Sequence, residues 1–184
     1  MSCNCNSYTL AGLCKDCQGN VGGISVVYVA LASAVSSVTI SDATADTGMI
    51  TAITLTNTGT TPFYEYQFKK NTGSMTSTLN VSDQGDTYVE TVLSLTFNRM
   101  ETKKRIEMNA LSVQDLVVIV KDCNGAYWYL GYDNPVNASN GGGETGTNRT
   151  DSNHYSLELT DISASYPYEV LGSIVSGLVT PANN

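Results

Sequence analysis

The stretch TYVETVLSLTFNRMETKKRIEMNALSVQDLVVIVKDCNGAYWYLGY, residues 87–132, contains the clearest structural pattern in the chain. Its first part alternates between an apolar set and a mostly polar set of side chains. The apolar set, with one threonine, is Val89, Thr91, Leu93, Leu95 and Phe97. A period of two predicts a strand with one buried face, on which Val92 is the apolar exception of the opposite side.

The rest of this stretch predicts a helix and two further strands. Asn98 is a suitable helix N-cap, and Glu101 stands three residues later as in a capping box, so a short helix is expected over residues 102–111. The continuous apolar run 116–120 predicts a strand covered on both faces. Asn124-Gly125 predicts a type I′ hairpin turn, because both central positions of that turn need positive φ. The aromatic residues 126–132 then return as the partner strand.

Outside this stretch the chain is also predicted to be mainly β, with no second clear helix. Expected strands cover residues 24–31, 35–41, 48–56, 63–69, 74–81, 155–159 and 166–170. Residues 1–23 are expected to form an irregular cysteine-rich arm, residues 24–171 a single β-rich domain, and residues 172–184 a C-terminal tail. The segment 134–151 is poor in apolar residues and contains Gly141-Gly142-Gly143, which predicts a flexible loop.

The composition excludes some classes of function. The chain has 184 residues, a net charge of −8 and 14% charged residues. Such an acidic chain does not predict a nucleic-acid interface that neutralises phosphates, although an acidic surface can let DNA pass without binding it. No segment reads as a secretory signal or a membrane span, so no membrane anchor is expected.

The cysteines offer one candidate metal site. Cys3, Cys5, Cys14 and Cys17 precede residue 18, and the Cys14/Cys17 spacing allows both thiolates to reach one zinc ion. The Cys3/Cys5 spacing is tighter than zinc sites usually have. Free thiols and a disulfide remain alternatives, and no other cofactor is expected.

The chain has no recognisable catalytic set. It contains a single histidine, His154, so histidine-paired nucleophiles and multi-histidine metal sites lack their parts. Tyrosine is abundant, with eleven residues against one tryptophan. Tyrosine suits surfaces that become interfaces, and a non-enzymatic structural or binding protein is therefore predicted.

A family resemblance follows from the order of several segments. These are Gly22-Gly23-Ile24 leading into Val27-Tyr28-Val29, FYEYQF at 63–68, GDTY at 85–88 with the alternating strand to Phe97, the helix, the apolar run 116–120, Asp122-Cys123-Asn124-Gly125 and Trp128. In this order the chain resembles small virion structural proteins, of the tail-tube or tail-hub kind, from tailed phages of Bacteroidota, including crAss-like phages. The resemblance covers most of the chain between residues 14 and 170.

The resemblance implies a tail-tube-like β-sandwich or barrel that forms a ring around a DNA conduit. The ring would hold six subunits or a multiple of six, contact other tail or neck proteins, and pass DNA without sequence-specific binding. It would assemble in the host cytoplasm and end up in the virion tail. Strands 74–81 and 87–98 are then the candidates to line or bridge the ring, through the interface residues Thr76, Thr78, Asn80, Glu90, Val92, Ser94 and Thr96.

A carbohydrate- or surface-binding β-sandwich is the alternative. In that hypothesis Tyr127, Trp128, Tyr129 and Tyr132 form a stacking platform. Strand alternation argues against a single platform, since Trp128 faces opposite to Tyr127 and Tyr129.

Overall fold

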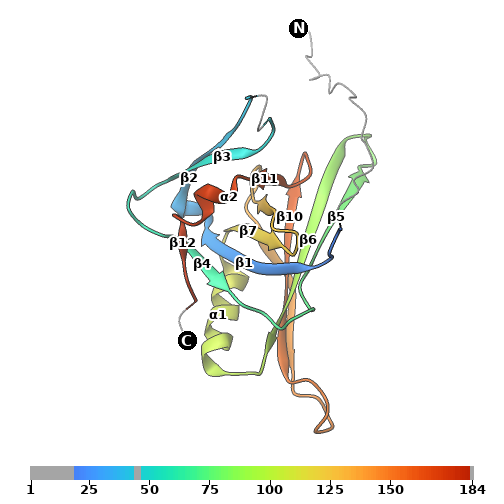
Figure 1. Ribbon diagram of the computed structural model, residues 1–184. Coiled ribbons are helices and arrows are strands. Elements are labelled where there is room, and N and C mark those ends of the chain that lie inside the picture. Colours follow the sequence, from blue (N-terminus) through green and yellow to red (C-terminus); the bar gives the residue numbers. More distant parts are fainter. Residues whose placement is uncertain (1–18, 44–46, 183–184) are drawn as a thin grey trace.

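The computed structural model describes residues 19–43 and 47–182 of the chain. The described chain is mainly β, as the sequence predicts, and its strands form one sheet of eight strands and one of four (Figure 1). The longest helix of the described chain is α1 (Thr102–Val113).

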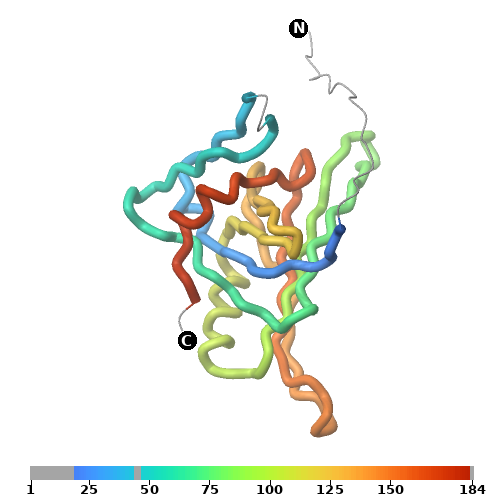
Figure 2. Tube along the Cα trace, viewed as in Figure 1, coloured from blue at the N-terminus to red at the C-terminus, as the bar shows by residue number. Residues whose placement is uncertain are grey.

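The larger sheet has the strand order β12-β4-β1-β7-β8-β11-β3-β2. It curls into a half-barrel (Figure 2). A 3-10 helix (Ala32–Ala34) joins β1 to β2, and the short helix α2 (Gly172–Val175) precedes β12. Its strands are β1 (Ile24–Leu31), β2 (Val35–Ile40), β3 (Ile50–Leu55), β4 (Phe63–Tyr66), β7 (Leu116–Asp122), β8 (Tyr127–Leu130), β11 (Tyr168–Val170) and β12 (Val179–Thr180).

The smaller sheet consists of two antiparallel hairpins side by side, in the order β5-β6-β10-β9. Its strands are β5 (Ser74–Val81), β6 (Thr87–Asn98), β9 (Asn137–Glu144) and β10 (His154–Ser163). The tips of the β5–β6 and β9–β10 hairpins project at opposite ends of the molecule (Figure 1). Residues 74–81, predicted as a polar strand, form β5 at one edge of this sheet.

Two hydrophobic cores lie on the two faces of β7. Val118 and Val120 join the first core, which fills the space between the two sheets and includes Leu93 and Leu159. Val117 and Ile119 join a second core, which the larger sheet and α2 enclose. The apolar run of β7 is therefore covered on both faces, as predicted, and the packing of the smaller sheet on one face of the larger sheet makes a sandwich.

The alternation in β6 is confirmed. Val89, Leu93, Leu95 and Phe97 are buried on the face toward the first core, together with Thr91, which accompanies them at 1% exposure. Between them, Val92 and its polar neighbours are partly exposed on the outer face of the smaller sheet. The burial of one side fixes the register, because a slip of one residue would place the apolar set in water.

The predicted type I′ turn is wrong. Of Asn124 and Gly125, only Gly125 has positive φ, at 96°. Residues 123–126 connect β7 to β8, and Asp122 N–H donates a hydrogen bond of 3.0 Å to Ala126 O. The Asp122 carboxylate accepts from Asn124 N–H at 2.8 Å and Ala126 N–H at 2.9 Å, and these side-chain bonds select the longer loop.

The helix begins at Thr102 as expected, but the predicted N-cap at Asn98 is wrong. Asn98 is the last residue of β6 and pairs with His154 of β10. The chain turns at Arg99, which has φ of 65°, and the helix begins at Thr102 after Glu101, whose side chain makes no cap hydrogen bond. Strand pairing with β10 thus overrides the local capping signal.

Two further expectations are corrected. The segment 134–151 is not a loop throughout, because residues 137–144 form β9 and pair with β10 along most of its length. The expected C-terminal tail belongs to the fold over its described residues 172–182, which include α2 and β12: Val175 is 2% exposed, and Val179 pairs with Phe63 of β4. In both cases long-range pairing supplies the order that local composition did not indicate.

The glycines of β9 yield a stability prediction. A Cβ at Gly143 would lie 2.7 Å from the Tyr155 ring and 2.9 Å from Met100 Cε. Gly143→Ala is expected to lower the free energy of unfolding by about 1–3 kcal/mol, because the ring must move. At Gly142 the nearest atom, Ser156 Oγ, is 3.8 Å away, so Gly142→Ala is the matched control without loss. Urea denaturation compares the two, and equal effects would show that Tyr155 does not pack on Gly143.

Candidate functional site

The predicted zinc ligands Cys3, Cys5, Cys14 and Cys17 lie outside the described residues. The fifth cysteine, Cys123, is exposed in the β7–β8 turn. Within residues 19–43 and 47–182, no group of three or more His, Cys, Asp or Glu side chains could hold a metal ion. The zinc site therefore stays a prediction.

The structure brings every predicted interface residue to one face. Thr76 pairs with Val92 and Thr78 with Glu90 across β5 and β6, so their side chains share the outer face of the smaller sheet. Thr76 and Thr78 are exposed, whereas the candidates on β6 are half-buried between neighbouring strands. Asn80, Ser94 and Thr96 complete this surface, which we call the outer face.

Polar side chains continue the outer face across the sheet. Asn80 Nδ2 donates to Glu90 Oε2 at 3.4 Å, and Ser94 Oγ donates to Glu158 Oε1 of β10, also at 3.4 Å. Thr160 Oγ1 and Ser139 Oγ lie 2.7 Å apart between β10 and β9. The four strands contain glutamates but no lysine or arginine. The outer face is therefore neutral to acidic and cannot neutralise phosphates.

The smaller sheet has two edge strands. β5 and β9 are its outermost strands, with eight residues each and no proline or lysine in either. Helix α1 contacts β9, which makes β5 the more open edge. Edges without charge or proline are templates for pairing with another chain.

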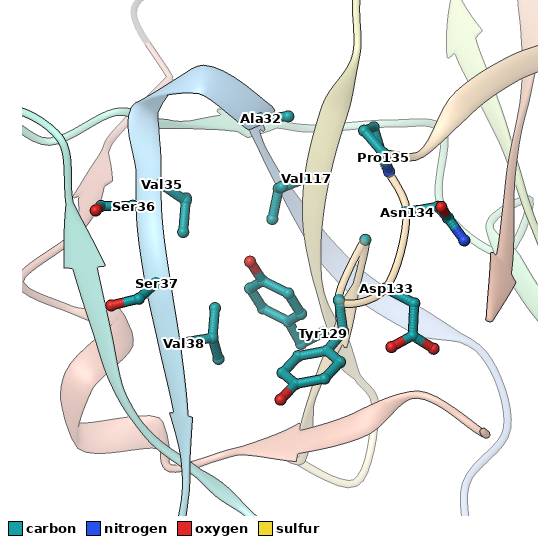
Figure 3. A pocket seen from close by; sticks show the side chains of 12 residues that line it. Ala32, Val35, Ser36, Ser37, Val38, Val117, Tyr129, Asp133, Asn134 and Pro135 are labelled. Carbon is teal, nitrogen blue, oxygen red and sulfur yellow. The ribbon is translucent and has the colours of Figure 1, made fainter. Parts of the chain in front are cut away.

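A pocket lies in the larger sheet beside the β8–β9 connection (Figure 3). It has a volume of about 370 Å³ and is walled by β2 on one side and by residues 131–135, here called the rim loop, on the other. Its apolar wall includes Val35, Val38 and Pro135, and its polar groups include Tyr129 and Asp133. We call it the rim pocket.

Hydrogen bonds fasten the rim loop to the end of β10. Asn134 Nδ2 donates to Ile162 O at 3.1 Å, and Ala164 N–H donates to Asp133 Oδ2 at 2.8 Å. Gly131 N–H and Ser163 Oγ both donate to the Asp161 carboxylate, the latter at 3.0 Å. These bonds connect the two sheets at the rim pocket.

One buried carboxylate oxygen beside the pocket lacks a partner. Asp161 is 3% exposed, and its Oδ1 has no hydrogen-bond partner in the described structure. Tyr129 is 1% exposed and lines the pocket. Burial, Asp161 and Tyr132 together raise the pKa of Tyr129. Buried polar groups without partners are uncommon, so this region is short of hydrogen-bond donors.

The buried Asp161 predicts a pH dependence of stability. Burial raises its pKa, the bonds from Ser163 and Gly131 oppose this, and Asp133 adds to the increase. Between the unfolded pKa, about 3.9, and the raised folded pKa, the native state keeps a proton that the unfolded chain releases. The stability contribution of Asp161 therefore falls as pH rises through this window, and Asp161→Asn is expected to gain stability over the parent protein between pH 4 and 7.

Thermal unfolding of Asp161→Asn and of the parent protein, at pH 4 and at pH 7, measures this difference in stability. Asp151→Asn is a control of opposite sign, because backbone N–H groups of Asn148 and Thr147 lower the pKa of Asp151. Asp151 contributes stability above its unfolded pKa and loses that contribution as pH falls through its lowered folded pKa. A gain for both variants at pH 7 would contradict the assignment.

The proposed aromatic platform is not formed. Trp128 packs toward the first core and donates from Nε1 to Asp122 Oδ2 at 3.2 Å. Tyr127 and Tyr129 belong to the second core on the opposite face. Tyr132 instead contacts Tyr168, with ring centroids 4.9 Å apart. The four rings cannot present one surface to a sugar.

Sequence reasoning missed the rim pocket, because β2 and the rim loop are distant in the chain and meet only through the larger sheet. One signal was available: Asp161 follows Leu157 and Leu159 at alternate positions of one strand, which places a carboxylate on a buried face.

No helix in the described part of the chain has the length and apolar character needed to cross a membrane. Comparisons with protein-family models, curated proteins and solved structures find no match to this chain.

Proposed function

We propose that this protein is a non-enzymatic structural subunit of a phage tail, which assembles into a ring around the DNA conduit. The observation that carries the proposal is the smaller sheet. It combines a polar outer face without lysine or arginine with an open edge strand, β5. The resemblance of the sequence to phage tail proteins supports the same function.

The outer face suits the wall of a DNA channel. Its hydroxyl and amide groups keep it wetted, and Glu90 and Glu158 repel phosphates rather than bind them. A channel wall of this kind lets a duplex slide, because it offers no cation to hold it.

The sheet edges suit ring closure. If β5 of one subunit pairs beside β9 of the next, the contact is heterologous, and a rotation that closes gives a ring. Pairing would also protect edges that otherwise favour aggregation. The resemblance sets the expected number of subunits at six or a multiple of six, with other tail or neck proteins as further partners and the virion tail as the location.

Light scattering and negative-stain microscopy of the purified protein test the proposal. The expected particle is a ring or tube with a central hole of about 20 Å or more, the width a DNA duplex needs. The particle is also expected to leave duplex DNA unshifted in a gel at low salt. Particles without a central hole, or tight DNA binding at low salt, would contradict the proposed role.

A further inference from the structure

The rim pocket has the size and the walls of a small-molecule site. Its volume of about 370 Å³ lies within the range of about 300–1,000 Å³ that ligand sites occupy. Figure 3 shows Val35 and Val38 on β2 across the pocket from Pro135 on the rim loop. Val117 of β7 also lines it. Walls of this kind favour a ligand with an apolar body, because binding removes apolar surface from water on both sides.

The rim loop is held in place before any ligand binds. Just after it, Val136 N–H donates to Leu116 O at 2.8 Å, and near its middle the Asp133 carboxylate accepts from Ala164 N–H. At Gly131, φ is 95° and a Cβ would lie 3.2 Å from Leu116 O, so the loop packs directly on β7. A preformed site loses less entropy on binding than a site that the ligand must order.

The charge beside the pocket is negative. Among the described residues that line it, Asp133 is the only charged one. Asp161 lies behind the rim loop, because its carboxylate accepts from Gly131 N–H; burial raises its pKa, and Asp133 is near enough to raise it further. Its other donor, Ser163 Oγ, is neutral as well. Two carboxylates beside neutral donors give the pocket a potential that attracts a cation.

The two carboxylates act on a ligand in different ways. Asp133 is exposed at the rim, and its bond to Ala164 uses Oδ2, which leaves Oδ1 for a ligand. Asp161 Oδ1 is buried and has no hydrogen-bond partner in the described structure, so it acts through its charge and not through contact. An ammonium group supplies several donors on one positive charge, and its bonds to a carboxylate are charge-assisted.

Two tyrosine rings complete the site. Tyr129 and Tyr132 both line the pocket, Tyr129 as a buried residue and Tyr132 as an exposed one at the rim. The ring of Tyr132 contacts that of Tyr168, with centroids 4.9 Å apart, which restricts its movement. The face of an aromatic ring attracts a cation, and such rings are the usual partners of organic ammonium groups.

We infer that the rim pocket binds a small organic cation, a free protonated amine with an apolar body, whose ammonium group pairs with Asp133. The body of the ligand lies against the apolar walls. A metal ion does not suit the pocket, since no group of three His, Cys, Asp or Glu side chains in the described chain could hold one. The inference goes beyond the proposed tail function and does not depend on ring formation.

Benzylamine and benzyl alcohol test the charge requirement on the unmodified protein. The two probes share one ring and differ in whether the polar end carries a positive charge. Benzylamine is expected to bind about tenfold tighter or more in a titration followed by NMR, because its bond to Asp133 is charge-assisted. The largest shifts are expected in the backbone amide signals of Val38, Tyr132 and Asp133. Equal affinity of the two probes, or shifts confined to other parts of the protein, would overturn the inference.

Variants separate the charge from the apolar wall. Asp133→Asn keeps an oxygen for Ala164 N–H and removes the charge, so it is expected to abolish the preference for benzylamine. Asp83→Asn is the matched control: it makes the same change at an exposed position between β5 and β6 and should keep the preference. Val38→Ala should weaken both probes by a similar factor, because it removes only apolar contact.

Thermal unfolding confirms that each variant is folded. A preference for benzylamine that survives in folded Asp133→Asn contradicts the pairing with Asp133. If Asp133→Asn does not fold, the comparison of the two probes on the parent protein decides.

A lysine side chain of another protein carries the same ammonium group, so N-acetyl-lysine methylamide is titrated as a third probe. It is expected to bind more weakly than benzylamine, because its flexible chain loses more rotational freedom and offers no ring to Tyr129 and Tyr132. Tighter binding of the lysine derivative would overturn the assignment to a free amine.

Discussion

Thr76→Lys/Thr78→Lys is expected to abolish ring assembly while leaving the subunit folded. Both threonines are exposed on β5, the open edge of the smaller sheet, where they pair with Val92 and Glu90 of β6. Lysine on an edge strand blocks pairing with another chain, because its charge must stay in water. Ring-sized particles should disappear from light scattering, and the melting temperature should change little, since exposed substitutions cost about 0.5 kcal/mol or less.

The matched control is Val113→Lys/Gln114→Lys. It adds the same positive charge at the exposed end of α1, where Val113 is 81% exposed, and leaves both sheet edges untouched. This variant should assemble like the parent protein. Rings of normal size from the β5 variant would show that β5 is not in the subunit contact, whereas loss in both variants would indicate a general charge effect.

Leu93→Ala is expected to lower the free energy of unfolding by about 2–5 kcal/mol. Leu93 is fully buried on the inner face of β6, in the core between the two sheets. Removal of its side chain leaves a cavity that neither sheet can fill without moving. Leu79→Ala on the neighbouring strand β5 is the control, because Leu79 is 53% exposed and should cost about 0.5 kcal/mol or less.

Denaturant unfolding followed by fluorescence and by circular dichroism measures both variants. The first core contains residues from both sheets and α1, so the described chain should unfold in one transition with both probes. Separate transitions would show that the smaller sheet is an independent unit. Equal losses for Leu93→Ala and Leu79→Ala would contradict the sandwich packing.

The strands with strong local patterns were predictable. The alternation in β6 and the apolar run of β7 each reflect a burial pattern repeated residue by residue, so the sequence alone reveals which sides are covered. The face shared by Thr76, Val92 and Glu90 followed from the same periodicity, because a strand places alternate side chains on one side.

The errors fall where distant segments override local signals. Gly141, Gly142 and Gly143 predicted a loop, but pairing with β10 makes them a strand in which Gly143 leaves room for the Tyr155 ring. Asn98 had the chemistry of a helix cap, but its pairing with His154 keeps it in β6. In each case backbone hydrogen bonds to another segment stabilise a conformation that local preference does not favour.

The sequence by itself determined the β class, the two-sided burial of β7 and the polar outer face of the smaller sheet, because each depends on periodicity within one strand. Only the tertiary structure decided the rim pocket and the buried position of Asp161 beside it. These features depend on which strands become neighbours. Strand order follows from the packing of whole sheets, and no local stretch of sequence encodes it.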